Sequence, residues 1–149
     1  MLLQQSGCSI GRPTHHLFFM HKLASLEAWK QSRHLSRVAY RLTLDGKLAK
    51  HFGLADQIRR AAAAIPANIA EGYALATTPQ FIRCLRIALG SATELYTHLE
   101  LASDLELVDA EHVQRGLKLC DHVIALLIGL IRRLGSRSTL PASPFPLPR

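Results

Sequence analysis

Four cations stand at spacings of three, four and four residues in the first third of the chain: Lys30, Arg33, Arg37 and Arg41. In a helix this spacing places all four on one side, and we call them the basic stripe. Like charges in such register destabilise a helix by roughly 0.2–0.5 kcal/mol per pair, and no acid lies between them. The stripe therefore predicts contact with the phosphates of RNA or DNA. Lys47 and Arg59 are candidates for further phosphate contacts.

The net charge of the chain supports this interpretation through its placement. The 149 residues carry a formal net charge of +7. Residues 1–60 contain ten Lys and Arg against three acids, whereas residues 61–149 contain eight of each sign. A basic surface in the first part favours a polyanion such as RNA, DNA or anionic lipid. A solvated face that only keeps the protein in solution fits the same composition.

A second set of polar residues also follows helical spacing: Gln57, Arg60, Asn68, Glu71 and Glu94. One interpretation is a ligand or nucleic-acid site. The other, which we favour, is a structural network of buried hydrogen bonds. In that network Arg60 pairs with Glu71 or Glu94 and fixes the register of two helices.

Residue types that support metal binding or catalysis form no recognisable pattern. None of the eight histidines is paired with another at three or four residues beside a carboxylate, and no HExxH motif occurs. Ser91 stands beside Gly90 in a predicted helix, with no histidine nearby in the sequence. The chain also lacks a glycine-rich phosphate loop. We expect no metal, no cofactor and no enzymatic activity.

Cysteine usage and hydropathy predict a cytoplasmic protein. The three cysteines are an odd number without a CxxC pair, which fits a reducing compartment. The N-terminal residues have no apolar segment long enough for a signal peptide. The longest apolar run, residues 123–131, is about half the length of a membrane span. We expect no membrane partner.

Four amphipathic helices are predicted to position these residues. The first is expected over residues 23–42 and the second over residues 52–72, where Gly72 would end it. The third opens at Thr78-Pro79, and Asp109 is a suitable cap for the last. Short connections then predict an all-α, antiparallel up-down-up-down four-helix bundle.

Small residues and one proline predict where the helices approach each other. The run of four alanines at residues 61–64 leaves little side chain, and Gly90-Ser91 in the third helix suggests a second close approach. Pro66 removes one backbone hydrogen bond from the second helix and predicts a kink near residues 62–65. The third helix carries an unbroken heptad seam: Phe81, Leu85, Ala88, Ala92, Leu95, Leu99 and Ala102.

The last helix has more apolar surface than one core requires. Its predicted seam is Val113, Leu117, Cys120, Ile124, Leu127, Ile131 and Leu134. The apolar residues outside this seam are Leu119, Val123, Leu126, Ile128 and Leu130. A surplus of this size predicts a second burial surface, and self-association is the simplest way to provide one.

These patterns divide the chain into three parts. Residues 1–21 are expected to form a flexible arm, residues 22–135 the four-helix bundle, and residues 136–149 a proline-rich disordered tail. Met20 stands just before the patterned part, and both Met1 and Met20 fit as the natural start.

Three segments resemble one bacterial family: LEAWKQ, FGLADQIRRAAAAIPANIAEG and QFIRCLRIALGSATELYTHLELA. This is the four-helix-bundle family encoded in 23S rRNA intervening sequences, and the resemblance spans roughly Leu23 to Leu134. The family pattern falls on Gln57, Arg60, Ala61, Asn68, Ile69, Ala70, Glu71, Gly72, Ala88, Gly90, Ser91, Glu94 and Leu95. The terminal extensions depart from the pattern, as does Lys50-His51 in place of an acid before the second helix.

The resemblance implies assembly into a homopentameric ring. The family is similar to the accessory variability protein of diversity-generating retroelements, which associates with nucleic acid and a reverse transcriptase. The expected partners are thus the chain itself, RNA or DNA, and a reverse transcriptase or another protein. We expect a non-enzymatic, oligomeric accessory protein that binds nucleic acid. The alternative is a protein-interaction scaffold ring without a nucleic-acid role.

Overall fold

The computed structural model describes residues 22–75 and 77–138, which form an antiparallel all-α bundle. Its four long helices are α2 (Glu27–Leu42), α3 (Phe52–Ala74), α4 (Thr78–Asp104) and α5 (Ala110–Ser138), with a short 3-10 helix, η1 (Leu48–Lys50), before α3. The predicted antiparallel four-helix bundle is confirmed. The arm predicted at residues 1–21 and residues 139–149 of the predicted tail lie outside the described residues.

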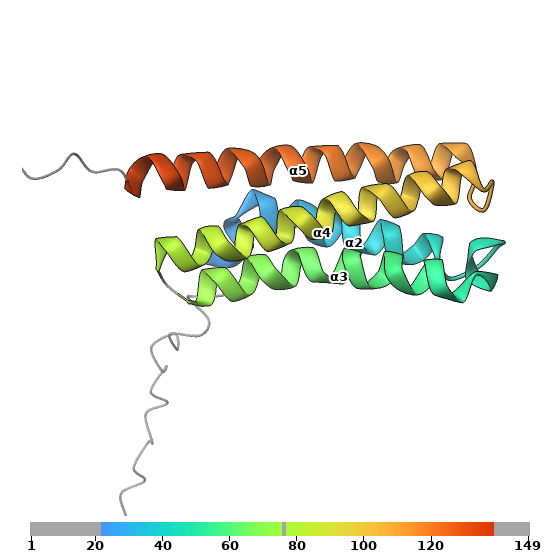
Figure 1. Cartoon of the computed structure of the whole chain (residues 1–149), viewed down its shortest axis with the longest axis horizontal. Helices are drawn as coiled ribbons and strands as arrows, with labels where there is room; N and C mark the ends of the chain where they lie inside the picture. The colour runs from blue at the N-terminus through green and yellow to red at the C-terminus, as the bar shows by residue number, and fades with distance from the viewer. Residues whose placement is uncertain (1–21, 76, 139–149) are drawn as a thin grey trace, which may run out of the picture.

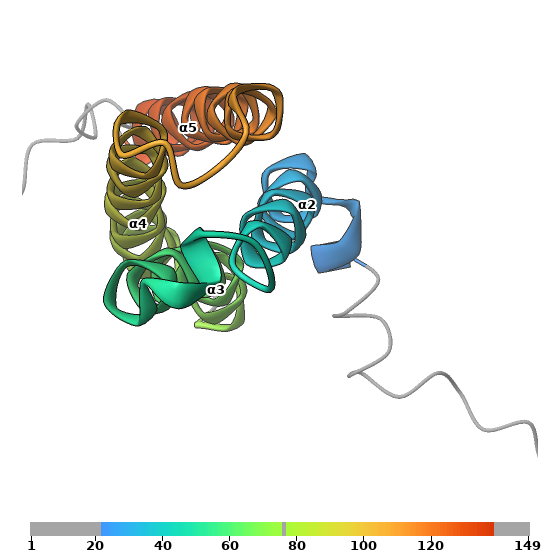
Figure 2. The same cartoon turned by 90° about the vertical axis from the view of Figure 1, so that its right-hand side faces the viewer.

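The helices share one long axis, and their connections divide between its two ends. The α2–α3 and α4–α5 connections lie at the same end, and the α3–α4 connection lies at the other (Figure 1). Viewed end-on, each helix occupies one corner, so that α2 packs on α3 and α5 while α4 packs on the same two neighbours (Figure 2). Leucine and isoleucine side chains from α2, α3 and α4 meet in the centre, where Leu35, Ile65 and Leu95 are fully buried. Each such side chain stabilises the bundle by roughly 1.5–3 kcal/mol through removal of apolar area from water.

The first predicted helix is divided in two by Leu26. Residues 22–25 form a separate helical turn, and Leu26 has extended backbone angles, φ −75° and ψ 115°, so that α2 begins only at Glu27. Leu23 in this turn is buried, which keeps the turn packed on the core. The expectation of one helix over residues 23–42 was therefore wrong at its first turn.

The close approach of α3 and α4 lies at Gly72 and not at Gly90. The prediction that Gly72 ends the helix was wrong, because α3 continues to Ala74 and buries Gly72. A Cβ atom at position 72 would stand 2.5 Å from the Cys84 Cβ. A Cβ atom at Gly90 would meet nothing within 4 Å, since Gly90 lies on the exposed side of α4. Gly72 is thus the packing residue, and Gly90 is not.

The predicted seam of α4 is confirmed, whereas that of α5 drifts. In α4 the side chains from Leu85 to Ala102 at the seam positions are buried. In the second half of α5 the buried residues are Val123, Leu127 and Leu130, while Ile124 and Ile131 are only partly buried. A helix with 3.6 residues per turn rotates by about 20° per heptad relative to a strict seven-residue repeat, and this rotation brings Val123 and Leu130 inward.

The core therefore absorbs most of the apolar surplus of α5. Val123 and Leu130 are buried, and Leu119 and Leu126 are partly buried and pack against the core. Within the described chain, the strongly exposed large apolar residues lie on other elements. The apolar surplus of α5 thus no longer supports self-association.

Two cysteines act as small apolar side chains of the core. Cys84 and Cys120 are both buried and free. Desolvation raises the pKa of the Cys120 thiol to about 12, with a smaller contribution from Asp121. The thiol is therefore protonated at neutral pH, which suits packing and not nucleophilic chemistry.

Pro66 lies inside α3, and a neighbouring helix satisfies the carbonyl group that this proline leaves without its usual donor. Proline has no backbone N–H, so the residue at position 66 cannot donate the usual helical hydrogen bond to the carbonyl oxygen of Ala62, four residues earlier. The Ser36 hydroxyl of α2 lies 2.5 Å from that oxygen and 2.8 Å from the Ser32 carbonyl oxygen. The proline thus creates a polar contact that joins α2 to α3.

This contact predicts a coupling between positions 36 and 66. Ser36→Ala should reduce the free energy of unfolding by about 1 kcal/mol, because the half-buried carbonyl loses its donor. In a Pro66→Ala background the same change should cost much less, since the introduced alanine supplies the missing N–H. Urea unfolding of the four variants measures the coupling, and equal costs in both backgrounds would contradict it.

Candidate nucleic-acid interface

The first residue of the basic stripe is paired with an acid. The Lys30 Nζ lies 2.8 Å from a carboxylate oxygen of Glu27, one turn earlier, and both side chains are about half exposed. The pKa of Glu27 is lowered, first by its hydrogen bond with Lys30 and then by that with Gln31. Glu27 precedes the four cations in the sequence, so the absence of an acid between them did not exclude this ion pair. Lys30 is consequently the member of the stripe with its charge most directly balanced.

Arg33, Arg37 and Arg41 are exposed on α2 as predicted by their spacing. Arg33 lies over the ring of Trp29, with its guanidinium carbon 4.7 Å from the ring centroid. Arg37 and Arg41 form no ion pair with any residue in the described part of the chain. These two side chains therefore have guanidinium groups available for an external anion.

Arg59 is held within the protein. Its Nε donates to the Thr43 hydroxyl oxygen and a terminal nitrogen donates to the Thr43 carbonyl oxygen, both at 2.7 Å. The guanidinium also lies 5.2 Å from the centroid of the Tyr40 ring. Because Thr43 is fully buried, these bonds fix the end of α2 on α3. This geometry gives Arg59 a structural role, so Arg59 is not among the residues that we propose to contact phosphates.

Lys47 lies in the connection between α2 and α3, and its Nζ is 3.4 Å from the Glu106 carbonyl oxygen. That long, exposed hydrogen bond joins the two connections at this end of the bundle. The turn predicted at Asp45-Gly46 is present, and Gly46 has the positive φ of 72° that glycine tolerates. Lys47 therefore keeps a solvent-exposed charge.

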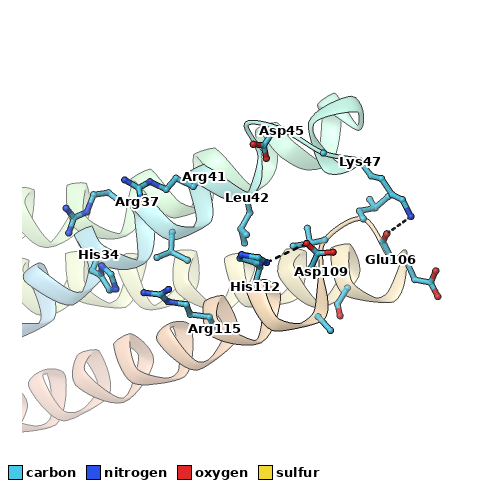
Figure 3. A pocket seen from close by; sticks show the side chains of 16 residues that line it. His34, Arg37, Arg41, Leu42, Asp45, Lys47, Glu106, Asp109, His112 and Arg115 are labelled. Carbon is cyan, nitrogen blue, oxygen red and sulfur yellow. Dashed lines mark hydrogen bonds and ion pairs between the residues drawn. The ribbon is translucent and has the colours of Figure 1, made fainter.

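A groove of about 1020 Å³ lies between α2, α5 and the connections at this end of the bundle (Figure 3). The cations on its walls are Arg37, Arg41, Lys47 and Arg115. A second hollow of about 510 Å³ shares His34 and Arg115 with the first and adds Lys118. We call the two together the α2–α5 groove. Three of the six predicted contact residues, Arg37, Arg41 and Lys47, meet there, while Lys30, Arg33 and Arg59 do not line it.

The cations on the α5 wall of the groove were not predicted from the sequence. Arg115 and Lys118 lie three residues apart on α5, and Figure 3 shows Arg115 and His34 pointing toward one another from the two helices. The spacing of Arg115 and Lys118 indicated that they share one face of a helix, but it did not indicate which other helix lies opposite that face. The antiparallel packing of α5 beside α2 supplies that information.

Acidic side chains gather where the groove opens toward the connecting segments. Asp45 and Glu106 come from the two connections, and Asp109 immediately precedes α5 (Figure 3). Asp109 lies 3.6 Å from Nδ1 of His112, an exposed pair that is ionic only when the histidine is protonated. The helical walls of the groove thus carry four cations, Arg37, Arg41, Arg115 and Lys118, and one acid, Glu111 of α5, and the groove is mixed in charge at this opening.

The structure does not join the second polar set into a buried network. Arg60 pairs with Asp56 at 3.1 Å, and both side chains are more than half exposed. Asn68 donates to the Ala64 carbonyl oxygen, and Glu94 lies 3.5 Å from His98 on its own helix. Glu71 is exposed and Gln57 half-buried. On an outer surface the partner one turn away is nearer than a partner across the interface, so local pairs replace the expected pairing of Arg60 with Glu71 or Glu94.

Residues 22–75 and 77–138 contain no cluster of three or more His, Cys, Asp or Glu arranged to hold a metal ion. None of the helices in this same part of the chain is long and apolar enough to cross a bilayer.

Comparison with known proteins places the chain in a family. Residues 24–129 match the sequence profile of the 23S rRNA-intervening sequence proteins, and this match covers more than half of the chain. The chain belongs to that family. No curated protein matches it significantly. The resemblance inferred from the three sequence segments is thereby confirmed.

A crystal structure is similar to this 23S rRNA-intervening sequence protein. It is that of a protein of unknown function from the S23 ribosomal protein family of Bacteroides thetaiotaomicron VPI-5482, determined at 1.70 Å resolution. The two chains are 28% identical with a TM-score of 0.64, and the match covers 70% of this chain and 98% of the other.

Proposed function

We propose that the chain is a non-enzymatic, oligomeric accessory protein that binds nucleic acid through the basic surface around α2 and α5. The observation that carries the proposal is that Arg37 and Arg41 of α2 line the same groove as Arg115 of α5. Guanidinium groups bind phosphate with charge-assisted, bidentate hydrogen bonds. Arg37 and Arg41 form no ion pair with an acid in the described part of the chain. Arg33, exposed on the same helix, extends this surface.

Phosphate contacts of this kind give salt-sensitive and sequence-tolerant binding. Each neutralised phosphate adds roughly 0.7–0.9 to the slope of log affinity against log salt concentration. Three arginines of α2 would therefore account for a slope of about 2–3, which is modest for one chain. A homo-oligomer multiplies such a surface by avidity, and we propose the homopentamer that the family resemblance implies.

The test compares two variants with the same change of net charge. We expect the Arg33→Glu/Arg37→Glu/Arg41→Glu variant to lose about tenfold or more of its affinity for a structured RNA at low salt, with a shallower salt dependence. The control, Arg83→Glu/Arg86→Glu/Arg132→Glu, changes exposed arginines at the opposite end of the bundle. Fluorescence anisotropy at two salt concentrations measures the affinities.

Circular dichroism and light scattering on the same preparations show whether each variant keeps its helices and assembly. A similar loss of affinity in both variants would indicate a general effect of net charge. An unchanged affinity of the α2 variant would overturn the proposal.

A second candidate function, a protein-interaction scaffold, is favoured by exposed apolar residues at the end of the bundle that holds the α2–α3 and α4–α5 connections. Phe52 is 81% exposed, and Leu44 and Leu105 are more than half exposed. Exposed apolar groups of this size are typical of protein interfaces. A partner retained after nuclease treatment, and lost on Phe52→Ser, would favour this function over nucleic-acid binding.

A further inference from the structure

The α2–α5 groove has features that distinguish between a single strand and a duplex. We propose that it binds a single-stranded segment of nucleic acid, whose phosphates contact cations on both walls. This inference rests on the proposed function and specifies its ligand. Arg37 and Arg41 come from the α2 wall, and Arg115 and Lys118 from the α5 wall. A strand between the walls contacts both pairs of cations.

The size of the groove fits a strand of a few nucleotides. Pockets of roughly 300–1,000 Å³ hold one drug-sized molecule. The main part of the groove has about 1020 Å³, and the hollow that continues it at His34 and Arg115 has about 510 Å³. In a duplex each strand is paired along its length with a second strand, so a single backbone cannot enter between the two walls by itself. The duplex would lie on the rim and leave the α5 wall largely unused.

The non-cationic side chains of the groove also suit unpaired bases. Trp, Tyr and Phe do not line either hollow, but the imidazole rings of His34 and His112 do, and histidine is one of the rings on which unpaired bases stack. Asp45 and Asp109 can accept hydrogen bonds from base amino groups. In a duplex those amino groups are engaged in pairing at the Watson–Crick edge, so the carboxylates would have only groove edges to contact.

The distribution of charge orients the strand. Arg37 and Arg115 lie along the helical walls, whereas Asp45 and Asp109 lie toward the connecting segments (Figure 3). The α5 wall of the second hollow adds Lys118 and one acid, Glu111. Carboxylates repel phosphates and can accept from bases. In this arrangement the phosphates of the bound strand lie beside the cations of the helical walls. Where the strand passes the connecting segments, its bases point toward the carboxylates of Asp45 and Asp109.

The test uses the full chain, a labelled unstructured 12-nucleotide RNA, the DNA of the same sequence, and the RNA annealed to its complement. We expect the single strands to bind at least about tenfold more tightly than the duplex at equal salt. Arg115→Glu/Lys118→Glu should lower single-strand affinity about tenfold or more and affect duplex binding by less than about threefold. The control, Arg132→Glu/Arg133→Glu, places the same charge change near the other end of α5 and should have a smaller effect on single strands.

The outcomes separate this inference from the proposed function. Equal or tighter binding of the duplex, or equal effects of the α5 variant and its control, would overturn the single-strand inference alone. Failure of all three nucleic acids to bind at low salt would overturn the proposed function and the inference with it. All four substituted residues are exposed, and thermal unfolding verifies that the variants remain folded.

Discussion

Replacing Gly72 by alanine is expected to lower the free energy of unfolding by about 1–3 kcal/mol, the usual cost of overpacking a well-packed interface. The new Cβ would stand 2.5 Å from the Cys84 Cβ and 3.0 Å from Cδ2 of the Phe81 ring. The first contact is the decisive one, because a Cβ atom is fixed by the backbone and cannot rotate away. The helices α3 and α4 would have to separate, which disturbs the edge-to-face packing of Phe81 on Tyr73.

The same substitution at Gly90 serves as the control. Gly90 is an exposed helical residue with open space around its Cα, so alanine there should raise the free energy of unfolding by about 0.5–1 kcal/mol. Urea unfolding at one fixed protein concentration measures both changes, since oligomerisation makes stability depend on concentration. Two changes of the same sign would contradict this assignment of packing roles.

Replacing Arg59 by alanine is expected to lower the free energy of unfolding by about 1.5–3 kcal/mol, the range for hydrogen bonds made by a charged group. The variant loses both 2.7 Å bonds to the buried Thr43 and the contact with the Tyr40 ring. Arg59→Lys should recover little of this stability, because a single ammonium cannot reproduce two hydrogen bonds in a fixed planar geometry. Thermal or urea unfolding measures these effects.

Arg60 provides the matched control for Arg59. Its only described ion pair is the exposed one with Asp56, so Arg60→Ala should change the free energy of unfolding by only about 0–1 kcal/mol. Nucleic-acid binding gives a second readout. If Arg59 is a structural residue, the folded Arg59→Ala protein keeps the wild-type affinity, and a loss of affinity larger than that of Arg60→Ala would return Arg59 to the nucleic-acid interface.

The arrangement of the polar residues could be predicted only in part. The spacing of Arg33, Arg37 and Arg41 was enough to place them on one exposed side of α2, since helical periodicity is a local property. The roles of Arg59 and Arg60, which are adjacent in the sequence, could not be distinguished. One points to the buried end of α2 and the other to solvent, and a rotation of about 100° between neighbouring residues of a helix produces that difference.

The sequence by itself determined the class of fold, the approximate helices and the family, because apolar periodicity, turn residues and family motifs are all local patterns. Tertiary packing decided which surfaces meet. It placed Arg115 in one groove with Arg37 and Arg41, brought Gly72 against Cys84, and rotated Val123 and Leu130 into the core. These outcomes depend on which helices are neighbours and on rotation accumulated over several turns, and neither is encoded at a fixed sequence spacing. Two of the four cations at the first observed spacing, Arg37 and Arg41, thus became part of one wall of a groove. The second wall came from a helix more than seventy residues later in the chain.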